Sequence, residues 1–178
     1  MKIAILGYSG AGKSTLARKL GELYRVPVLH LDQVQFIPGW VVRDQREAAD
    51  LVSAFMEQPE WVIDGNYGGF HQRRRLEEAD KILILNFPRL ICLYRVLNRW
   101  RLSHGRTRED MAPGCPEKVD REFLWWVLHE GRNRARREHF RRILAEWPDK
   151  ALALGSQRRV DEYLRGLMSK AGENTALK

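Results

Sequence analysis

Short apolar runs alternate with longer amphipathic stretches along most of the chain. The apolar runs are typical of buried strands, and the longer stretches carry apolar residues at helical spacing, as at Leu16, Leu20 and Leu23. We expect five strands, at residues 2–6, 26–31, 61–63, 81–87 and 151–154. We expect helices at residues 14–24, 43–57, 88–103, 119–147 and 159–168. Gly131 is a point at which the long fourth helix can bend or divide.

Strands that are apolar along their whole length and alternate with helices are typical of a parallel sheet covered on both faces. The pattern therefore predicts the α/β class, with three layers in the order α/β/α. In this architecture ligands bind at the carboxyl ends of the strands. The residues that follow the expected strands are Gly7, Asp32, Asp64, Asn86 and Gly155. We expect the functional site among them.

The segment from Gly7 to Ser14 matches the phosphate-binding pattern G-x-x-x-x-G-K-[ST] without a gap. Glycines let the backbone curl around phosphates, and the N–H groups of the curl and of the following helix attract anions. Lys13 can reach the outer phosphates, and the Ser14 hydroxyl suits Mg²⁺, which prefers oxygen ligands. The segment, called the phosphate loop below, predicts binding of ATP with Mg²⁺. The expected contacts are Gly7, Ser9, Gly10, Ala11, Gly12, Lys13, Ser14 and Thr15.

Two carboxylates follow expected strands that can flank the first one. A magnesium–triphosphate site needs a carboxylate at the end of a second strand, so we expect Asp64 to hold the metal together with Ser14. Asp32 is expected to orient the hydroxyl group of the phosphoryl acceptor, and with Lys13 it is a candidate catalytic residue. A turn or helix-capping role is the alternative for each aspartate.

Arginines are frequent in the region that follows the fourth strand. Arg95 and Arg99 are four residues apart and share a helix face, and Arg108 lies in the Gly- and Pro-rich stretch beyond them. Phosphoryl transfer spreads negative charge that such side chains can neutralise. We expect these three to close on the phosphates as a lid, with Arg99 and Arg108 in catalytic roles. The arginines of residues 132–142 are expected on a solvated face or in a secondary contact with an anion.

The acceptor side is expected after the second and third strands. Trp40 lies in a turn shortly after Asp32 and can line an acceptor pocket. Asn66 and Arg73 follow Asp64 and are expected on the same side, and the neighbouring arginines up to Arg75 can line it as well.

Composition narrows the class of protein. The formal net charge is +8, from 31 Lys and Arg against 23 Asp and Glu, and a positive charge suits anionic partners such as nucleotides, phosphorylated metabolites or nucleic acid.

The length of 178 residues favours one domain at residues 1–170 with a frayed tail at 171–178. No apolar run approaches the roughly 18–20 residues of a membrane span. The two cysteines form no CxxC pair. We therefore expect a cytoplasmic protein without a disulfide framework.

Several motifs in this order resemble the adenylate-kinase-like superfamily of P-loop kinases. They are Gly7–Ser14, His30–Asp32, Trp61–Tyr67, Leu93–Arg99 and Arg108–Asp110. Within that superfamily the order, including residues 38–40 and 110–115, is similar to that of the bacterial DNA topology modulation proteins, from residue 1 to about 168.

That resemblance implies a P-loop NTPase fold, a five-stranded parallel sheet in the order 2-3-1-4-5 and a short helical lid near 100–120. It implies that Arg99 and Arg108 contact phosphate and that Ser156 lies beside the adenine. The chain departs from adenylate kinases at Gly65–Gly68, where those enzymes carry a run that helps bind a nucleoside monophosphate, and this departure argues against such an acceptor.

These features favour a kinase that transfers the γ-phosphoryl group of ATP to a small molecule such as a nucleoside, a nucleotide or another metabolite. The alternative is a nucleotide-dependent DNA-binding or topology-modulating regulatory protein without kinase activity, with residues 132–142 on the DNA backbone. A third hypothesis is a plain nucleoside triphosphatase whose acceptor is water. The sequence supplies no motif for reading DNA bases.

Overall fold

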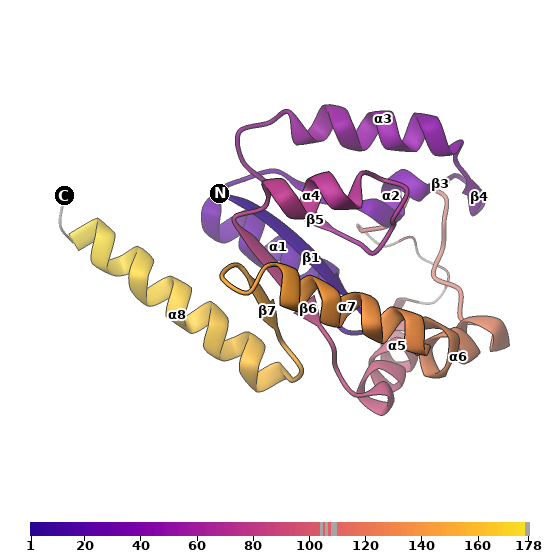
Figure 1. Ribbon diagram of the computed structural model, residues 1–178. Helices are drawn as coiled ribbons and strands as arrows, with labels where there is room; N and C mark the ends of the chain where they lie inside the picture. The colour runs from indigo at the N-terminus through magenta and orange to yellow at the C-terminus, as the bar shows by residue number, and fades with distance from the viewer. Residues whose placement is uncertain (104, 106, 108–109, 177–178) are drawn as a thin grey trace.

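Five parallel strands form the sheet at the centre of the computed structural model, which describes residues 1–103, 105, 107 and 110–176 (Figure 1). The strands are β1 (Lys2–Gly7), β2 (Val28–His30), β5 (Trp61–Asp64), β6 (Lys81–Leu85) and β7 (Ala151–Ala153). They lie in the order β2-β5-β1-β6-β7, and every neighbouring pair is parallel. Counted in chain order among these five strands, the order is 2-3-1-4-5, as expected.

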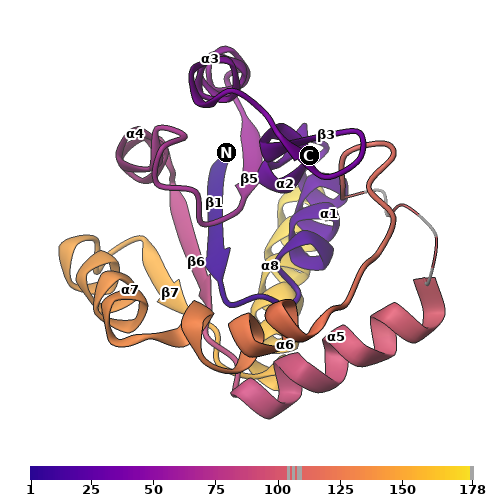
Figure 2. The same ribbon diagram turned by 90° about the vertical axis from the view of Figure 1, so that its right-hand side faces the viewer.

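Helices cover both faces of this sheet. The helices of the described residues are α1 (Lys13–Tyr24), α2 (Leu31–Gln35), α3 (Gln45–Met56), α4 (Gln72–Glu78), α5 (Arg89–Ser103), α6 (Arg121–Leu128), the 3₁₀ turn η1 (Glu130–Arg132), α7 (Arg134–Glu146) and α8 (Gln157–Ala176). Figure 2 shows α4 and α7 on one face and α1 and α8 on the other, with α5 and α6 beyond the carboxyl ends of the strands. The structure thus confirms the three-layer α/β/α architecture.

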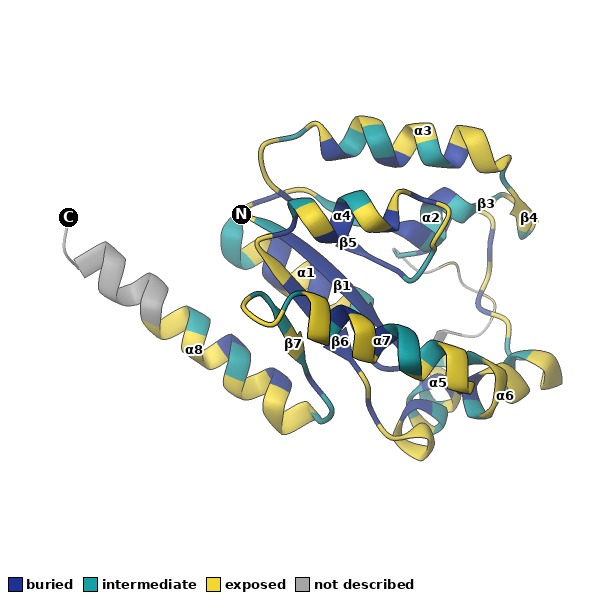
Figure 3. Ribbon diagram, in the orientation of Figure 1, coloured by how far each residue is buried: buried dark blue, intermediate teal, exposed yellow. Residues whose placement is uncertain are grey.

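The core lies where the apolar runs predicted it. Residues Ile3–Leu6 of β1 and Ile82–Ile84 of β6 are completely buried, and Leu16 and Leu20 of α1 pack against the sheet. Figure 3 shows buried strands and helices whose outer sides are exposed. Burial of apolar surface stabilises a fold by about 25 cal/mol per Å², so these strands fix the frame that carries the site.

The long helix expected at 119–147 is divided into α6, η1 and α7. A Cβ atom on Gly131 would lie 2.9 Å from both the carbonyl oxygen and the indole nitrogen of Trp126, so this position has no room for a side chain. The Asn133 side chain then caps α7 by accepting a hydrogen bond from the N–H of Arg136 at 2.8 Å. The capped start of α7 and the close contact at Gly131 together explain the break.

Several short elements were not expected from the sequence. Helices α2 and α4 and a two-stranded antiparallel sheet of β3 (Phe36–Ile37) and β4 (Val41–Val42) fall in stretches for which no helix or strand was expected.

Helix α8 begins two residues earlier than expected and continues to Ala176 instead of ending at Met168. None of the described helices combines the length and the apolar character that a membrane crossing requires.

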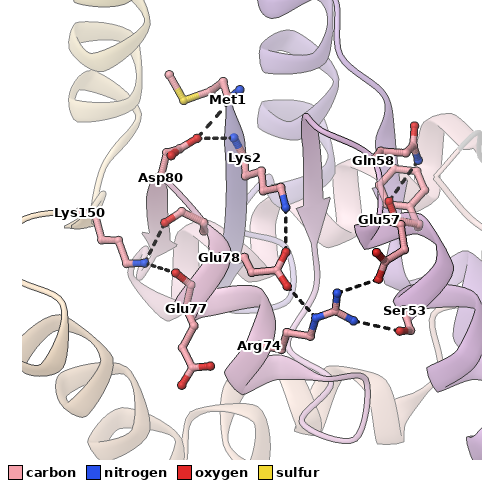
Figure 4. Close-up of polar contacts among 12 residues, drawn as sticks. Met1, Lys2, Ser53, Glu57, Gln58, Arg74, Glu77, Glu78, Asp80 and Lys150 are labelled. Atoms are coloured by element: carbon pink, nitrogen blue, oxygen red, sulfur yellow. Dashed lines mark hydrogen bonds and ion pairs between the residues drawn. The ribbon is translucent and has the colours of Figure 1, made fainter.

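A network of charged side chains connects the elements at the amino ends of the strands (Figure 4). Lys2 donates to Glu78 at 2.8 Å, and Arg74 donates to the same carboxylate at 2.6 Å and to Glu57 at 2.8 Å. Lys150 donates to the carbonyl oxygens of Glu77 at 2.7 Å and Ala79 at 2.8 Å. Arg74 therefore ties α4 to α3 and does not face the acceptor side.

Candidate active site

The phosphate loop connects β1 to α1 at the carboxyl edge of the sheet. Gly7, Gly10 and Gly12 have φ values of 145°, 77° and 95°, which glycine adopts without the strain that a side chain would bring. Helix α1 begins at Lys13, directly after this curl. Its first N–H groups and the positive end of its dipole therefore lie at the loop, which is the arrangement that binds phosphate in proteins.

Helix α5 packs closely against the phosphate loop. A Cβ atom on Gly10 would lie only 2.6 Å from the carbonyl oxygen of Cys92. Arg95 donates from Nη1 to the carbonyl oxygen of Ala11 at 2.9 Å and from Nη2 to Oε1 of Gln157 at 2.8 Å. The shape of the loop thus depends on α5 as well as on the loop's own glycines.

Arg132 is buried against the same loop, and its assignment to a solvated face was wrong. Its Nη1 donates to the carbonyl oxygen of Phe87 at 2.8 Å and its Nε to that of Val127 at 3.0 Å. Its guanidinium lies 3.9 Å from the centroid of the Tyr8 ring, within cation–π range. Nη2 is buried without a hydrogen-bond partner in the described part of the chain. Arg132 therefore links η1 to the first turn of the phosphate loop.

Ser14 and Asp64 meet beside the loop, as the sequence predicts for a magnesium site. The Ser14 hydroxyl donates to Oδ2 of Asp64 at 3.1 Å, and Nδ1 of His30 contacts Oδ1. Burial alone would lower the pKa of His30, but the hydrogen bond and charge of Asp64 outweigh it and raise that pKa above its usual value. The Ser14 hydroxyl and the Asp64 carboxylate are oxygen ligands of the kind that Mg²⁺ prefers. The described residues include no group of three or more His, Cys, Asp and Glu that could hold a metal ion by themselves.

Asp32 of α2 is held by Tyr67, which lies in the loop after β5. The Tyr67 hydroxyl donates to Oδ1 of Asp32 at 2.6 Å. Burial first, and then the charge and hydrogen bond of Asp32, raise the pKa of Tyr67 far above its usual value, so the hydroxyl stays a donor.

A buried arginine shapes the segment that carries Tyr67. Arg75 donates to the carbonyl oxygens of Phe70 at 2.9 Å, Tyr67 at 2.7 Å and Gly65 at 3.4 Å. Burial lowers the pKa of Arg75 to about 10, against the opposing charge of Asp64, so it remains a cation at neutral pH. Arg75 was expected to be able to line the acceptor side; instead it holds the backbone of residues 65–70 in place.

Trp40 lies where the β3–β4 hairpin meets the lid segment, residues 104–120. Its backbone N–H donates to Sγ of Cys115 at 3.4 Å and its indole N–H to the carbonyl oxygen of Pro116 at 3.2 Å. Its ring meets that of Phe36 edge to face at 5.2 Å. In its described residues the lid segment is a loop with one antiparallel bridge between Thr107 and Pro116. The helices of the lid region are the end of α5 and the start of α6.

Arg99 reaches the lid segment from α5. Its Nε and Nη2 donate to the buried carboxylate of Glu117 at 3.0 and 2.8 Å. Arg108, the other expected lid arginine, lies outside the described residues.

These groups surround one pocket of about 1290 Å³. The site residues expected from the sequence that line it are Ser9, Gly10, Ala11, Gly12, Lys13, Ser14, Thr15, Asp32, Trp40, Arg95 and Arg99. Its nucleotide half is defined here as the phosphate loop with Arg95 and Gln157. Its acceptor half is defined as Asp32, Phe36, Trp40, Tyr67, Asp110 and Met111.

Four further expected contacts do not line the pocket, namely Gly7, Asp64, Asn66 and Ser156. The Asn66 amide accepts from the N–H of Gly7 at 3.0 Å and donates to the carbonyl oxygen of Gly7 at 2.7 Å. Asn66 thus holds the first residue of the phosphate loop and does not reach the acceptor half. Ser156 accepts from the N–H of Arg159 at 3.3 Å, within the first turn of α8.

Arg73 does not join the acceptor half. Its side chain is exposed and donates to Glu77 at 2.7 Å and to Glu146 at 2.8 Å. It also lies over the ring of Trp147, at the wall of a separate hollow of about 320 Å³. The structure therefore separates Arg73 from Asp32 and Trp40.

Sequence reasoning missed the roles of His30, Tyr67, Arg75 and Arg132. His30 stands two residues before Asp32, and Tyr67 three residues after Asp64, so the strand-end positions were a signal for both. The two arginines lie in Arg-rich stretches and carry no local sign of burial.

Comparison with solved structures gives matches that span nearly the whole chain at low identity. A shikimate kinase from Bacteroides thetaiotaomicron is 16% identical over 97% of this chain and 98% of its own, with a TM-score of 0.49. An uncharacterized protein from Eubacterium ventriosum is 14% identical over 96% of this chain and 98% of its own, with a TM-score of 0.50. No protein-family model matches, and no curated protein does.

At these identities a structural match shows the fold alone. The observed strand order and the phosphate loop after β1 give the chain a three-layer α/β/α fold of the P-loop NTPase type. The finer resemblance to DNA topology modulation proteins is not confirmed by these comparisons.

Proposed function

We propose that this protein is a kinase that transfers the γ-phosphoryl group of Mg·ATP to a hydroxyl group of a small molecule. The observation that carries the proposal is that the phosphate loop and Asp32 line the same pocket of about 1290 Å³. A phosphate site and a carboxylate in one pocket can hold two substrates next to each other. Positioning of this kind supplies much of the rate enhancement in phosphoryl transfer.

The triphosphate binds at the loop through backbone N–H groups and the start of α1, and Lys13 neutralises its outer charge. Lys13 now donates to the carbonyl oxygen of Tyr8 at 3.3 Å, so it already lies against the loop. Ser14 and Asp64 would hold Mg²⁺, which would supply positive charge against the phosphate oxygens. Arg95 contacts the loop at Ala11, and Arg99 lines the same pocket. Arg95 can stabilise negative charge as it shifts during transfer, and Arg99 can do so when its ion pair with Glu117 opens.

Asp32 orients the acceptor hydroxyl and accepts its proton. Tyr67 holds Oδ1 of Asp32, which fixes the direction of the carboxylate. A base held in this way contributes about 10²–10⁴-fold to a proton-transfer step.

Nucleotide-dependent binding of DNA, or a topology-modulating role, remains the alternative. It is favoured by exposed arginines on α7, namely Arg134, Arg137, Arg141 and Arg142. Arg134 already pairs with Glu138 at 2.6 Å, which weakens its share of such a surface. Water as the acceptor is less favoured, because the pocket continues past Asp32 to aromatic side chains.

A screen of ATP consumption tests the proposal directly. Wild-type protein is incubated with Mg·ATP and with nucleosides, nucleotides and small hydroxylated metabolites, and the Lys13→Ala variant serves as the blank. We expect ADP formation that depends on one acceptor and is lost in the variant. Transfer at a near wild-type rate in Lys13→Ala would overturn the assignment.

A further inference from the structure

The acceptor half of the pocket has walls of a definite chemical character. Phe36 and Trp40 stand edge to face with ring centroids 5.2 Å apart, and Met111 lines the same half. Phe36 and Trp40 pack against a small buried cluster that Met111 forms with Ala112 and Cys115. Flat aromatic rings and a thioether favour a flat or apolar ligand group.

The backbone at Trp40 is held in a conformation that few side chains adopt. Its φ is +64°, in the left-handed region that normally belongs to glycine. Hydrogen bonds from Trp40 to Cys115 and Pro116, and from the N–H of Gly39 to the carbonyl oxygen of Gly114 at 3.0 Å, keep the turn in place. Strained residues of this kind gather at ligand sites, where the surrounding contacts sustain them. The indole is therefore a fixed part of the pocket wall.

The polar end of this half is a single oriented carboxylate. Among the described residues, Tyr67 bonds to Asp32 at Oδ1 and leaves Oδ2 facing the pocket that Asp32 lines. Oδ2 can accept a hydrogen bond from one hydroxyl group of a ligand.

The charges nearby disfavour a second anion. Asp32 and Asp110 both line the pocket, and two of its cations are already paired: Arg99 with Glu117 at 2.8 Å and Lys118 with Asp120 at 3.1 Å. The other described cations that line it belong to α1 or bond to the phosphate loop, namely Lys13, Arg18, Lys19 and Arg95. Among the described residues, an anionic group bound beside the Asp32 carboxylate would meet a like charge, at a cost in free energy.

We propose that the phosphoryl acceptor is an alcohol with a flat ring and no anionic group, as in a nucleoside, and that Trp40 determines this specificity. The inference rests on the proposed kinase function. The ring lies against Trp40 and Phe36, and its hydroxyl donates to Asp32. The hydroxyl oxygen bonds to the γ-phosphorus of ATP, the bond from that phosphorus to the β–γ bridging oxygen breaks, ADP leaves, and the hydroxyl proton passes to Asp32.

Matched compounds test the acceptor class. The panel pairs the four common ribonucleosides and hydroxymethyl-substituted heteroaromatic rings with their phosphate or carboxylate derivatives, and it includes aliphatic polyols. Acceptor-dependent ADP formation is measured for each. We expect at least tenfold higher kcat/KM for an uncharged flat-ring alcohol than for its anionic partner and for every polyol. Preference for an anionic partner or a polyol would overturn the inference and leave the kinase function standing.

Binding gives a readout that does not depend on turnover. Saturation-transfer NMR with Mg·ADP present is expected to detect uncharged flat-ring alcohols on wild-type protein and on Trp125→Ala, an exposed tryptophan of α6 outside the pocket lining. Trp40→Ala should lose that binding at least tenfold, and Trp40→Phe should retain most of it, while Mg·ATP affinity is unchanged in both.

The outcomes separate the two proposals. If no flat-ring alcohol binds, or if Trp40→Ala binds as well as wild type, the acceptor assignment is overturned. If these alcohols bind and depend on Trp40, but no compound supports transfer above the Lys13→Ala blank, the ligand class and the role of Trp40 in binding stand, and the kinase function fails.

Discussion

The two halves of the pocket are built in different ways. The nucleotide half uses backbone atoms of one continuous loop, held between β1, α1 and α5 with no room for a side chain at Gly10. The acceptor half uses side chains from α2, from a hairpin of two-residue strands, from the lid segment and from the loop after β5. Phosphates are common to many ligands, so a backbone cradle suffices for them. Side chains particular to this chain are what can select one acceptor.

Two glycines with similar backbone angles give the sharpest contrast and the largest expected effect. Gly10 has φ of 77° and a backbone oxygen 2.6 Å from a new Cβ, whereas Gly39 has φ of 83° and nothing within 4 Å. We expect Gly10→Ala to lower the free energy of unfolding by about 3 kcal/mol and Gly39→Ala by about 1 kcal/mol.

Urea unfolding and Mg·ATP titration measure both effects. ATP affinity should fall by about 100-fold in Gly10→Ala, since 1.4 kcal/mol corresponds to a factor of ten, and stay within about twofold in Gly39→Ala. Equal losses in the two variants would contradict the division into a rigid and an open half.

Removing the charge at Asp64 tests the metal end of the nucleotide half. Asp64→Asn keeps the shape of the side chain but removes the negative charge that attracts Mg²⁺. We expect the gain in ATP affinity that Mg²⁺ brings to disappear, with metal-free ATP binding nearly unchanged. The exposed Asp50→Asn is the matched control. A full magnesium dependence in Asp64→Asn would exclude this carboxylate as a ligand.

Each half has its own buried arginine, and replacing them in turn should separate the two functions. Arg132 supports Tyr8 of the phosphate loop, and Arg75 supports the backbone that carries Tyr67. Each Arg→Met change leaves carbonyl oxygens without a donor, at a cost of about 1–3 kcal/mol in stability.

Steady-state kinetics on variants with native circular dichroism give the readout. We expect Arg132→Met to raise KM for ATP about tenfold, and Arg75→Met to raise KM for the acceptor about tenfold, each with little effect on the other constant. If both variants raised both constants alike, the halves would be one cooperative unit.

The smallest effect is expected on α7, which lies outside both halves. Arg137→Gln with Arg141→Gln should change both KM values by less than about twofold. The same variant tests the DNA hypothesis, because phosphate contacts make binding steeply dependent on salt. If wild-type protein shifts duplex DNA at low salt and the variant does not, the DNA hypothesis gains; if wild-type protein shifts none, it is lost.

The phosphate loop could be predicted because its residues are contiguous and its glycines have a backbone reason to be there. Asp32 and Asp64 followed from the rule that parallel strands gather their carboxyl ends at one edge. The acceptor half could not be predicted in the same way. Its contacts join residues 35 apart, as Tyr67 and Asp32, or 75 apart, as Trp40 and Cys115, and no local pattern carries them.

In the fold as well, contiguous patterns were predicted from the sequence and contacts between distant segments were not. The five core strands were evident as apolar runs, whereas α2, α4 and the β3–β4 hairpin are too short for a period to show. The burial of Arg132 and the break at Gly131 depend on tertiary partners, Tyr8 and Trp126, that lie on other elements or one turn away. In both cases a contact with another segment or another turn outweighed the preference of the local sequence.

The proposed transfer depends on binding of the triphosphate at the phosphate loop. Calorimetric titration of Mg·ATP into wild type, Lys13→Ala and the exposed control Lys81→Ala tests it most directly. We predict one ATP per chain in wild type and in Lys81→Ala, and an affinity at least 30-fold lower in Lys13→Ala, or about 2 kcal/mol. Equal affinity in all three proteins would contradict the account.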